Sequence, residues 1–244
     1  MGKTTTAINL AACLAQMGRR VLLVDLDPQA NATTGCGVDR DDIGQSVYNL
    51  LMGQARASEC VVRVKAADFD LLPATAGLTA AEVELLSVEQ GRELQLRGAL
   101  MEIASNYQTV LLDCPPSLNI LTLNALVAAE GVLVPIQCEY FALEGLSSLV
   151  GVIEGLTDRS NPDLEISGII RTMYDGRNRL ARDVSEQLQE HFPNEIFRTI
   201  IPRNVRLAEA PGFGVPVLQH DRQASGTLAY AALAGELIRR GLSE

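Results

Sequence analysis

Hydrophobic positions along the chain form short continuous runs that alternate with longer amphipathic segments. Runs of β-branched and leucine residues occupy residues 21–27, 69–73, 109–113, 131–137, 165–173 and 197–202. Continuous apolar runs of this length are typical of strands covered on both faces. Helix-like stretches lie between them, at residues 4–17, 82–105, 119–129, 143–157, 178–191 and 224–240. The alternation predicts an α/β fold with a predominantly parallel sheet flanked by helices.

We predict a single domain over residues 1–244, because no low-complexity linker, internal repeat or charge block divides the chain. Residues 35–65, which mix glycine, aspartate and scattered charges, are interpreted as a peripheral excursion. With 47% hydrophobic and 20% charged residues, a chain of this length can bury a sizeable core. That composition excludes disordered and fibrous proteins.

Charge and cysteine usage narrow the classes of function. The formal net charge is −10, so any contact with DNA must come from a local basic patch. The five cysteines are scattered singly, which argues against a disulfide framework or a zinc site and favours a cytoplasmic location. The longest apolar stretch, residues 118–137, is broken by polar residues and Gly131, so we interpret it as a helix and a buried strand rather than a membrane span.

The chain opens with Gly2-Lys3-Thr4, the second half of a P-loop, followed at once by a helical run. In such loops, backbone N–H groups and the helix N-terminus hold phosphates, the lysine reaches the β- and γ-phosphates, and the next hydroxyl binds Mg²⁺. The three-residue match is a weak signal alone. Two predicted strands strengthen it by ending in acids, at Asp25 and Asp27 and at Asp113. Ligands of open α/β sheets bind at these strand ends, although a single such aspartate could equally cap a helix.

Three separated segments resemble one family. They read GKTTTAINLAACLAQMGRRVLLVDLDPQANAT (2–33), VLLDCPPSLNILTLNAL (110–126) and IIPRNVRLAEAPGFG (200–214). In this order they resemble the ParA/Soj chromosome-partitioning ATPases, which have a deviant Walker A motif on a P-loop NTPase fold. The resemblance covers essentially the whole chain. It implies an enzyme that hydrolyses ATP to ADP and phosphate with Mg²⁺ and drives chromosome or plasmid segregation.

The resemblance also implies roles for individual residues. At the phosphates, Lys3 is the catalytic P-loop lysine and Thr4 is a ligand of Mg²⁺. Asp27 would position or activate the hydrolytic water, and Asp113 would bind Mg²⁺ through water. The remaining implied nucleotide-binding residues are Gly2 and Thr5 at the phosphates and Pro202 and Asn204 at the adenine.

For partners, the resemblance implies a homodimer that forms on ATP binding, binds DNA non-specifically on the nucleoid, and releases it when a ParB-like protein stimulates hydrolysis. No membrane partner is implied. It places Arg177 and Arg206 at the DNA. Residues 171–206 carry seven arginines against five acids, whereas the rest of the chain has 13 basic and 25 acidic residues. The alternative is a solvated helix face with ion pairs such as Arg179–Asp183 and Arg182–Glu186.

The sequence departs from the family at its start. The family loop reads Lys-Gly-Gly-x-Gly-Lys-Thr-Thr, and Met1 stands here at the x position. The signature lysine and the first strand, expected in the middle of the sheet, are therefore missing. We expect the true start about 10–20 residues upstream, enough for one strand and its loop. A chain that truly begins at Met1 is expected to fold poorly and to show little ATPase activity.

Three other functions remain open at this point. A membrane-surface ATPase resembling MinD would need a C-terminal basic amphipathic helix, and residues 237–244 are too short for one. An iron–sulfur electron donor resembling nitrogenase reductase would need cysteines in glycine-rich contexts, which Cys114 and Cys138 lack. A non-catalytic remnant of such an ATPase fits the incomplete loop but not the retained Lys3, Asp27 and Asp113.

Overall fold

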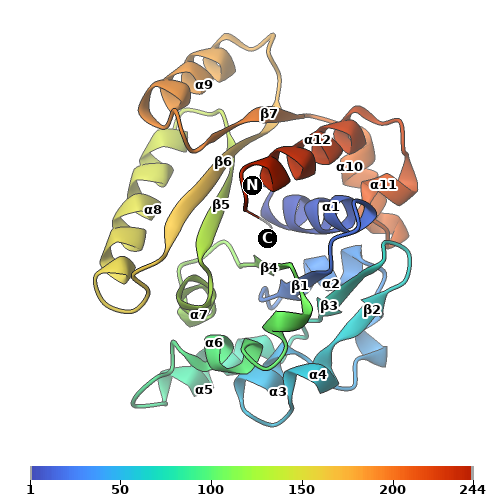
Figure 1. Ribbon diagram of the computed structural model, residues 1–244, viewed down its shortest axis with the longest axis vertical. Coiled ribbons are helices and arrows are strands. Elements are labelled where there is room, and N and C mark those ends of the chain that lie inside the picture. Colours follow the sequence, from blue (N-terminus) through green and yellow to red (C-terminus); the bar gives the residue numbers. More distant parts are fainter. Residues whose placement is uncertain (1, 243–244) are drawn as a thin grey trace.

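The computed structural model describes residues 2–242, whose strands form two sheets flanked by helices (Figure 1). The first sheet has the order β2-β3-β1-β4, and the second has the order β5-β6-β7. Every strand pair is parallel except the β2–β3 pair. The predicted α/β fold with a mostly parallel sheet is confirmed. The strands are β1 (Val21–Asp25), β2 (Val62–Val64), β3 (Phe69–Leu72), β4 (Thr109–Asp113), β5 (Gly131–Gln137), β6 (Glu165–Tyr174) and β7 (Ile196–Pro202).

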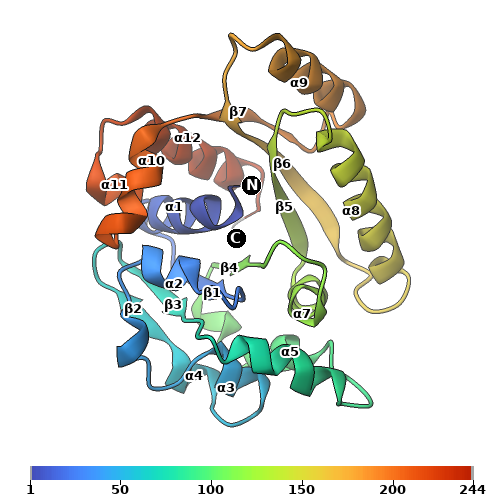
Figure 2. The same ribbon diagram turned by 180° about the vertical axis from the view of Figure 1, so that it is seen from behind.

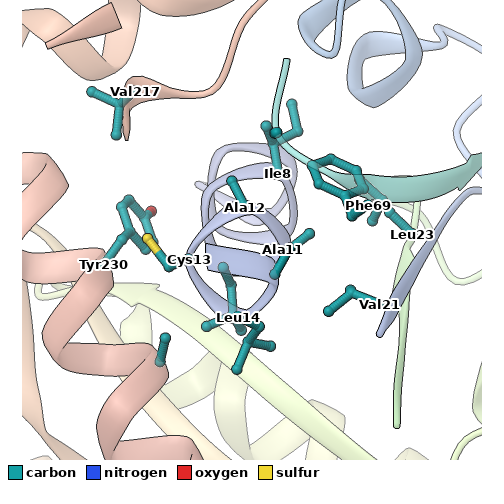
Figure 3. Close-up of a cluster of buried hydrophobic side chains, with 14 of the residues drawn as sticks. Ile8, Ala11, Ala12, Cys13, Leu14, Val21, Leu23, Phe69, Val217 and Tyr230 are labelled. Carbon is teal, nitrogen blue, oxygen red and sulfur yellow. The ribbon is translucent and has the colours of Figure 1, made fainter. Parts of the chain in front are cut away.

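Helix α1 (Lys3–Gln16) lies in the centre of the molecule. Figure 3 looks along it, with Leu23 and Phe69 of the first sheet on one side and Tyr230 of α12 (Ser225–Arg239) on the other. Ala11 and Ala12 on α1 are fully buried, and their small side chains let neighbouring elements approach closely. The phosphate-loop sequence therefore begins a helix that is fixed from both sides.

Helices α3 to α7 cover the outer face of the first sheet and α8 and α9 cover that of the second, whereas α2, α10 and α11 lie beside α1 and α12 (Figures 1 and 2). Leu22 and Val24 of β1 pack against the group α3 to α7, while β5 and β6 pack against α8 and α9. These helices are α2 (Asn31–Gly35), α3 (Val47–Leu51), α4 (Ala57–Cys60), α5 (Leu78–Leu86), α6 (Gln95–Leu100), α7 (Ile120–Ala128), α8 (Ala142–Thr157), α9 (Arg179–His191), α10 (Val205–Glu209) and α11 (Val217–His220). Three short 3₁₀ helices complete them, at Arg40–Asp42, Ala104–Asn106 and Ala210–Phe213. No helix within residues 2–242 is long and apolar enough to span a bilayer.

Two predicted segments differ from the structure. The single helix expected over residues 82–105 is wrong: α5 and α6 are separate, and Gly91 between them has φ +71°, a left-handed conformation that ends helices. Residues 35–65 are more than a peripheral excursion. Their helices α3 and α4 bury Val47, Leu50 and Cys60 against β1, and they supply the antiparallel strand β2.

The two sheets are not joined to each other by strand pairing. Within residues 2–242, β4 pairs with β1 and β5 pairs with β6, but β4 and β5 do not pair. Residues 110–112 of β4 are half-buried, whereas all five residues of β1 are buried. Leu111 of β4 and Leu133 of β5 both pack on the core around α1. The division falls where the first strand of the family was expected.

Candidate functional site

The site begins at the N-terminus of α1. Gly2 caps this helix with φ +106°, and its carbonyl accepts the Thr6 N–H at 2.8 Å. A Cβ at Gly2 would lie 3.3 Å from Thr172 Oγ1, so both the backbone angle and the close packing favour glycine. The first turn of α1 contains no acidic residue. Because the first N–H groups of a helix have no partner within the helix, this end attracts anions.

Two carboxylates meet at the ends of neighbouring strands. Asp25 ends β1 and Asp113 ends β4, and the two are directly paired in the parallel ladder. Asp27 follows two residues after Asp25, and all three aspartates are buried. Lys3 and the Thr4 side chain both lie close enough to Asp113 to lower the pKa of its carboxyl. The structure thus brings Lys3 and Thr4 together with these acids.

Asp25 is saturated with hydrogen bonds. Its Oδ1 accepts the Asp27 N–H at 3.1 Å, and its Oδ2 accepts the Thr33 N–H at 2.8 Å and the Thr33 hydroxyl at 2.7 Å. The Thr33 hydroxyl oxygen in turn accepts the Ala74 N–H at 2.9 Å. Asp25 therefore anchors the loop that carries Asp27. The sequence alone does not separate Asp25 from the other strand-end acids, since only the fold brings Thr33 to it.

Asp113 is in a different situation. Its Oδ2 atom is buried and has no hydrogen-bond partner within the described residues. Burial raises the pKa of Asp113 to about 7; the Thr4 hydrogen bond and Lys3 oppose this increase, whereas the charges of Asp25 and Asp27 add to it. Burial also raises the pKa of Asp25, against the lowering effect of its hydrogen bonds. The surroundings of these three aspartates therefore contain too little positive charge to balance their carboxylates.

This shortage fits a divalent cation that arrives with a phosphate. Across residues 2–242, no group of three or more His, Cys, Asp or Glu side chains is arranged to hold a metal. Mg²⁺ usually keeps several waters and takes one or two protein oxygens together with phosphate oxygens. The Thr4 hydroxyl and the unpaired Asp113 oxygen are protein oxygens at this site that could hold such an ion, directly or through water.

A cavity of about 330 Å³ opens beside the same end of α1. Thr4, Thr5 and Asn31 give it polar walls, while Pro211 and Pro216 line an apolar side. Such a combination suits a ribose and a planar base. Residues 210–214 belong to the third segment of the family resemblance, but no role followed for them from the sequence, because their approach to α1 depends on the fold.

The predicted adenine residues do not line this cavity. Pro202 is the last residue of β7, and Asn204 caps α10. The Asn204 Oδ1 accepts the Arg206 N–H at 2.9 Å, and its Nδ2 donates to Ser225 Oγ at 2.7 Å. Both ends of the carboxamide thus join α10 to α12, and the adenine role of these residues stays a prediction.

A close backbone crossing joins the loop after Asp27 to the segment at residues 210–216. A Cβ at Gly37 would lie 2.5 Å from the Gly214 carbonyl oxygen, and a Cβ at Gly214 would lie 2.8 Å from the Gly37 Cα. Both residues have positive φ, at +76° and +65°. Only glycine fits this crossing without displacing the backbone.

The two predicted DNA-contacting arginines follow the carboxyl ends of neighbouring strands. Arg177 comes after β6 and Arg206 after β7, and these strand ends are paired at Tyr174 and Pro202. Arg177 is exposed and bonds the Asp175 carboxylate through Nε at 2.9 Å and Nη2 at 2.7 Å, which lowers the pKa of Asp175 to about 2.

Arg206 is also held by acids. It contacts Glu209 through Nη1 at 2.8 Å and Asp221 through Nε at 3.4 Å, and both contacts leave the guanidinium half-exposed. DNA phosphates would have to replace these carboxylates.

The basic segment around these arginines is only partly a surface. Arg171 is 4% exposed and donates to Ser185 and the Phe197 carbonyl, so it belongs to the interior. The alternative ion pair Arg179–Asp183 is present at 3.7 Å. Arg182 instead donates to the Gly176 carbonyl at 2.9 Å.

Comparison with known proteins identifies the family. A family model described as an AAA domain matches residues 1–166. The chromosome-partitioning ATPase Soj of Thermus thermophilus is 52% identical over 241 residues, which cover 98% of this chain and 92% of that protein. The chromosome partitioning protein ParA of Caulobacter vibrioides is 48% identical, covering 98% of this chain and 90% of that protein. The chain belongs to the ParA/Soj family. The resemblance found in the sequence is confirmed.

Solved structures give the same result for the fold of this ParA/Soj protein. Cobyrinic acid a,c-diamide synthase from Mycobacterium smegmatis, solved with bound ADP and magnesium, is 37% identical with a TM-score of 0.85, covering 99% of this chain and 91% of that one. The Pyrococcus furiosus cell division ATPase MinD has a TM-score of 0.76 at 23% identity, covering 98% of this chain and 93% of that one. The second likeness shows the fold alone.

Proposed function

We propose that this ParA/Soj protein is an ATP-dependent partitioning enzyme. It would bind ATP with Mg²⁺ at the N-terminus of α1, dimerise, bind DNA non-specifically, and release it when a ParB-like protein stimulates hydrolysis. The observation that carries the nucleotide site is the unpaired, buried Asp113 oxygen beside Thr4 and Lys3 at a glycine-capped helix. The names of the relatives support the role in segregation.

In this proposal the chain's own residues divide the work at the phosphates. The N–H groups after Gly2, together with Thr5, hold phosphate oxygens, and Lys3 neutralises them. Thr4 contributes its hydroxyl to Mg²⁺, and Asp113 holds the ion through water. Bound Mg²⁺ would supply positive charge to the phosphates. The bound ADP and magnesium of the related M. smegmatis structure support this choice of ligands.

Asp27 is proposed to position the attacking water. Its Oδ1 accepts the Gln29 N–H at 2.9 Å, and Asp25 fixes its backbone. One carboxylate oxygen is thus engaged in the loop, while the side chain is held near Asp113. A carboxylate fixed in this way can orient a water and accept its proton.

For the base, two placements follow from different observations. The cavity beside Thr4 and Thr5 favours a base against Pro211 and Pro216. The family resemblance favours Pro202 and Asn204 instead. Alanine substitution at each pair distinguishes them, since only the pair that contacts adenine should weaken ATP more than inorganic triphosphate.

ATP-dependent binding of DNA is the experiment that tests the proposed function. We expect the protein with Mg²⁺ and ATP to bind duplex DNA of any sequence, and Arg206→Ala to weaken it uniformly and reduce the salt slope by about one unit. Nucleotide affinity should be unchanged in this variant. Arg159→Ala is the control. Arg159 is exposed and precedes the amino end of β6, whereas Arg206 follows the carboxyl end of the parallel strand β7. Loss confined to particular base sequences would contradict the proposal.

The competing function is a membrane-surface ATPase like MinD, with which this chain shares a fold. Sedimentation with anionic lipid vesicles separates the two. Pelleting that requires ATP would favour the MinD-like function, whereas DNA binding without pelleting favours partitioning.

A further inference from the structure

Asn9 is a buried polar residue in the middle of α1 that lines the cavity beside Thr4 and Thr5, but the proposed function gives it no contact with the nucleotide. Its side chain is 5% exposed. The Nδ2 donates to the Thr5 carbonyl at 2.7 Å, one turn toward the phosphate end of the same helix. The Oδ1 accepts the Val217 N–H at 2.8 Å, at the start of α11. One carboxamide thus connects the phosphate-binding turn to a distant part of the chain.

The connection continues from Val217 to Arg206, which lies on the exposed surface of α10. The Thr227 hydroxyl of α12 is placed between the Asp221 carbonyl at 2.6 Å and the Val217 carbonyl at 3.4 Å. Asp221, directly after α11, forms the ion pair with Arg206. Val217 itself is fully buried beside α1 (Figure 3). Any shift of α11 relative to α1 would therefore change the surroundings of Arg206.

A second bond between α1 and the C-terminal helices does not follow this route. The Thr6 hydroxyl and the Tyr230 hydroxyl are 3.1 Å apart in the core, and Tyr230 lies on α12. This contact joins α1 to α12, whereas the Asn9 bond joins α1 to α11, and it does not involve Val217 or Asp221. It provides a matched control for a bond that only stabilises the packing.

We propose that Asn9 is a positioning residue that couples nucleotide binding at the start of α1 to the α10–α11 surface that carries Arg206. This inference rests on the proposed function. Nucleotide that draws the Thr5 turn toward its phosphates changes the Asn9 carboxamide, and the carboxamide changes the position of α11. Because such coupling is reciprocal, DNA at Arg206 must alter nucleotide affinity by the same factor.

The first test uses hydrogen exchange of the unaltered protein. The Val217 amide donates to Asn9, so its exchange rate reports this bond directly. We expect saturating Mg–ATP to change its protection by about 5-fold or more, the lower end of typical allosteric coupling. A fluorescent ATP analogue measures nucleotide binding separately. Nucleotide binding without any change at Val217 overturns the inference and leaves the proposed function standing, whereas absence of nucleotide binding overturns both.

The second test uses variants. Asn9→Leu removes both bonds, and Asn9→Asp keeps an acceptor for Val217 but loses the donor to Thr5. In both, the ratio of DNA affinities with and without ATP should fall to within about 2-fold of one at nucleotide concentrations that saturate the variant, because Asn9 also lines the cavity beside Thr4 and Thr5. Tyr230→Phe should lower the melting temperature and keep the wild-type ratio. An unchanged ratio in Asn9→Asp, or equal loss in Tyr230→Phe, would show that Asn9 is not the connection.

Discussion

Asp25 and Asp27 are separated by one residue, yet their carboxylates have different surroundings. Both carboxylate oxygens of Asp25 accept hydrogen bonds, from Thr33 and from the Asp27 N–H. Within residues 2–242, only one oxygen of Asp27 accepts a hydrogen bond, from the Gln29 N–H. We expect Asp27→Asn to reduce ATP turnover by about 10²-fold, the usual loss when a positioned base is removed. ATP affinity should stay within about 3-fold, since binding depends on the helix N-terminus and Lys3.

Asp25→Asn is the contrasting variant. It replaces an acceptor of three hydrogen bonds in the core, so its main effect should be a lower melting temperature. We would measure steady-state turnover, binding of an ATP analogue and thermal melting for both variants. Together these show whether each aspartate acts in hydrolysis or in stability. Normal turnover in Asp27→Asn would remove Asp27 from the mechanism.

At this scale the sequence selected residue positions more readily than it predicted their contacts. Motif and strand-end position selected Lys3, Thr4 and Asp113, and the structure places these three together. It could not predict that one Asp113 oxygen is unpaired, or that Asn9 bonds to α11, because both depend on segments far apart in the chain.

Strand β7 is joined to helix α12 through one carboxylate. Glu236 accepts the Arg198 and Thr199 N–H groups at 2.8 and 2.9 Å, the Thr199 hydroxyl at 2.7 Å, and an ion pair from Arg240 at 3.0 Å. Burial alone would raise its pKa, but these hydrogen bonds and Arg240 hold the pKa of Glu236 below its usual value. Because the folded pKa is depressed, this stabilisation is present above the unfolded pKa, near 4.3, and is lost as the pH falls through the folded value.

Glu236→Gln tests this join. We expect it to lower the free energy of unfolding at pH 7 by about 1–3 kcal/mol, because Gln accepts fewer hydrogen bonds and carries no charge. The difference from the wild type should shrink between pH 5 and pH 3, since the wild-type carboxylate is then being protonated. Urea unfolding across this range measures both. Parallel pH profiles for the two proteins would refute the assignment.

Elements were predictable where one period governs a long segment. All six apolar runs are strands, and the helices expected at residues 4–17, 143–157 and 224–240 are α1, α8 and α12. The helix over residues 82–105 failed because a left-handed Gly91 interrupts an otherwise acceptable pattern. The short α10, α11 and β2 carry too few residues to show a period, and their neighbours in the fold decide their conformation.

At the scale of the whole molecule, the two sheets of the described residues are not paired with each other and are joined by the core around α1. β1 is paired on both sides and fully buried, whereas β4 and β5 are each paired on one side within residues 2–242. In a parallel strand, successive N–H groups point to opposite neighbours. For a protein made of residues 1–244 we therefore expect alternate amides of β4 to exchange with solvent much faster than the amides of β1, which should exchange only on global unfolding.

Residue-resolved hydrogen exchange measures this difference. The amides of β3, which is paired with β1 and β2, are the internal control. Uniformly slow exchange along β4 would show that its outer edge is covered in solution.

The crossing of Gly37 and Gly214 has a consequence for how this sequence can diverge. Each residue occupies the space that a side chain on the other would need, and glycine cannot be made smaller to compensate. A change at one position therefore forces the two loops apart, which frees the other position from its constraint. We expect the two glycines to persist together or to disappear together among descendants. A lineage that has lost both would have separated the loop after Asp27 from residues 210–216.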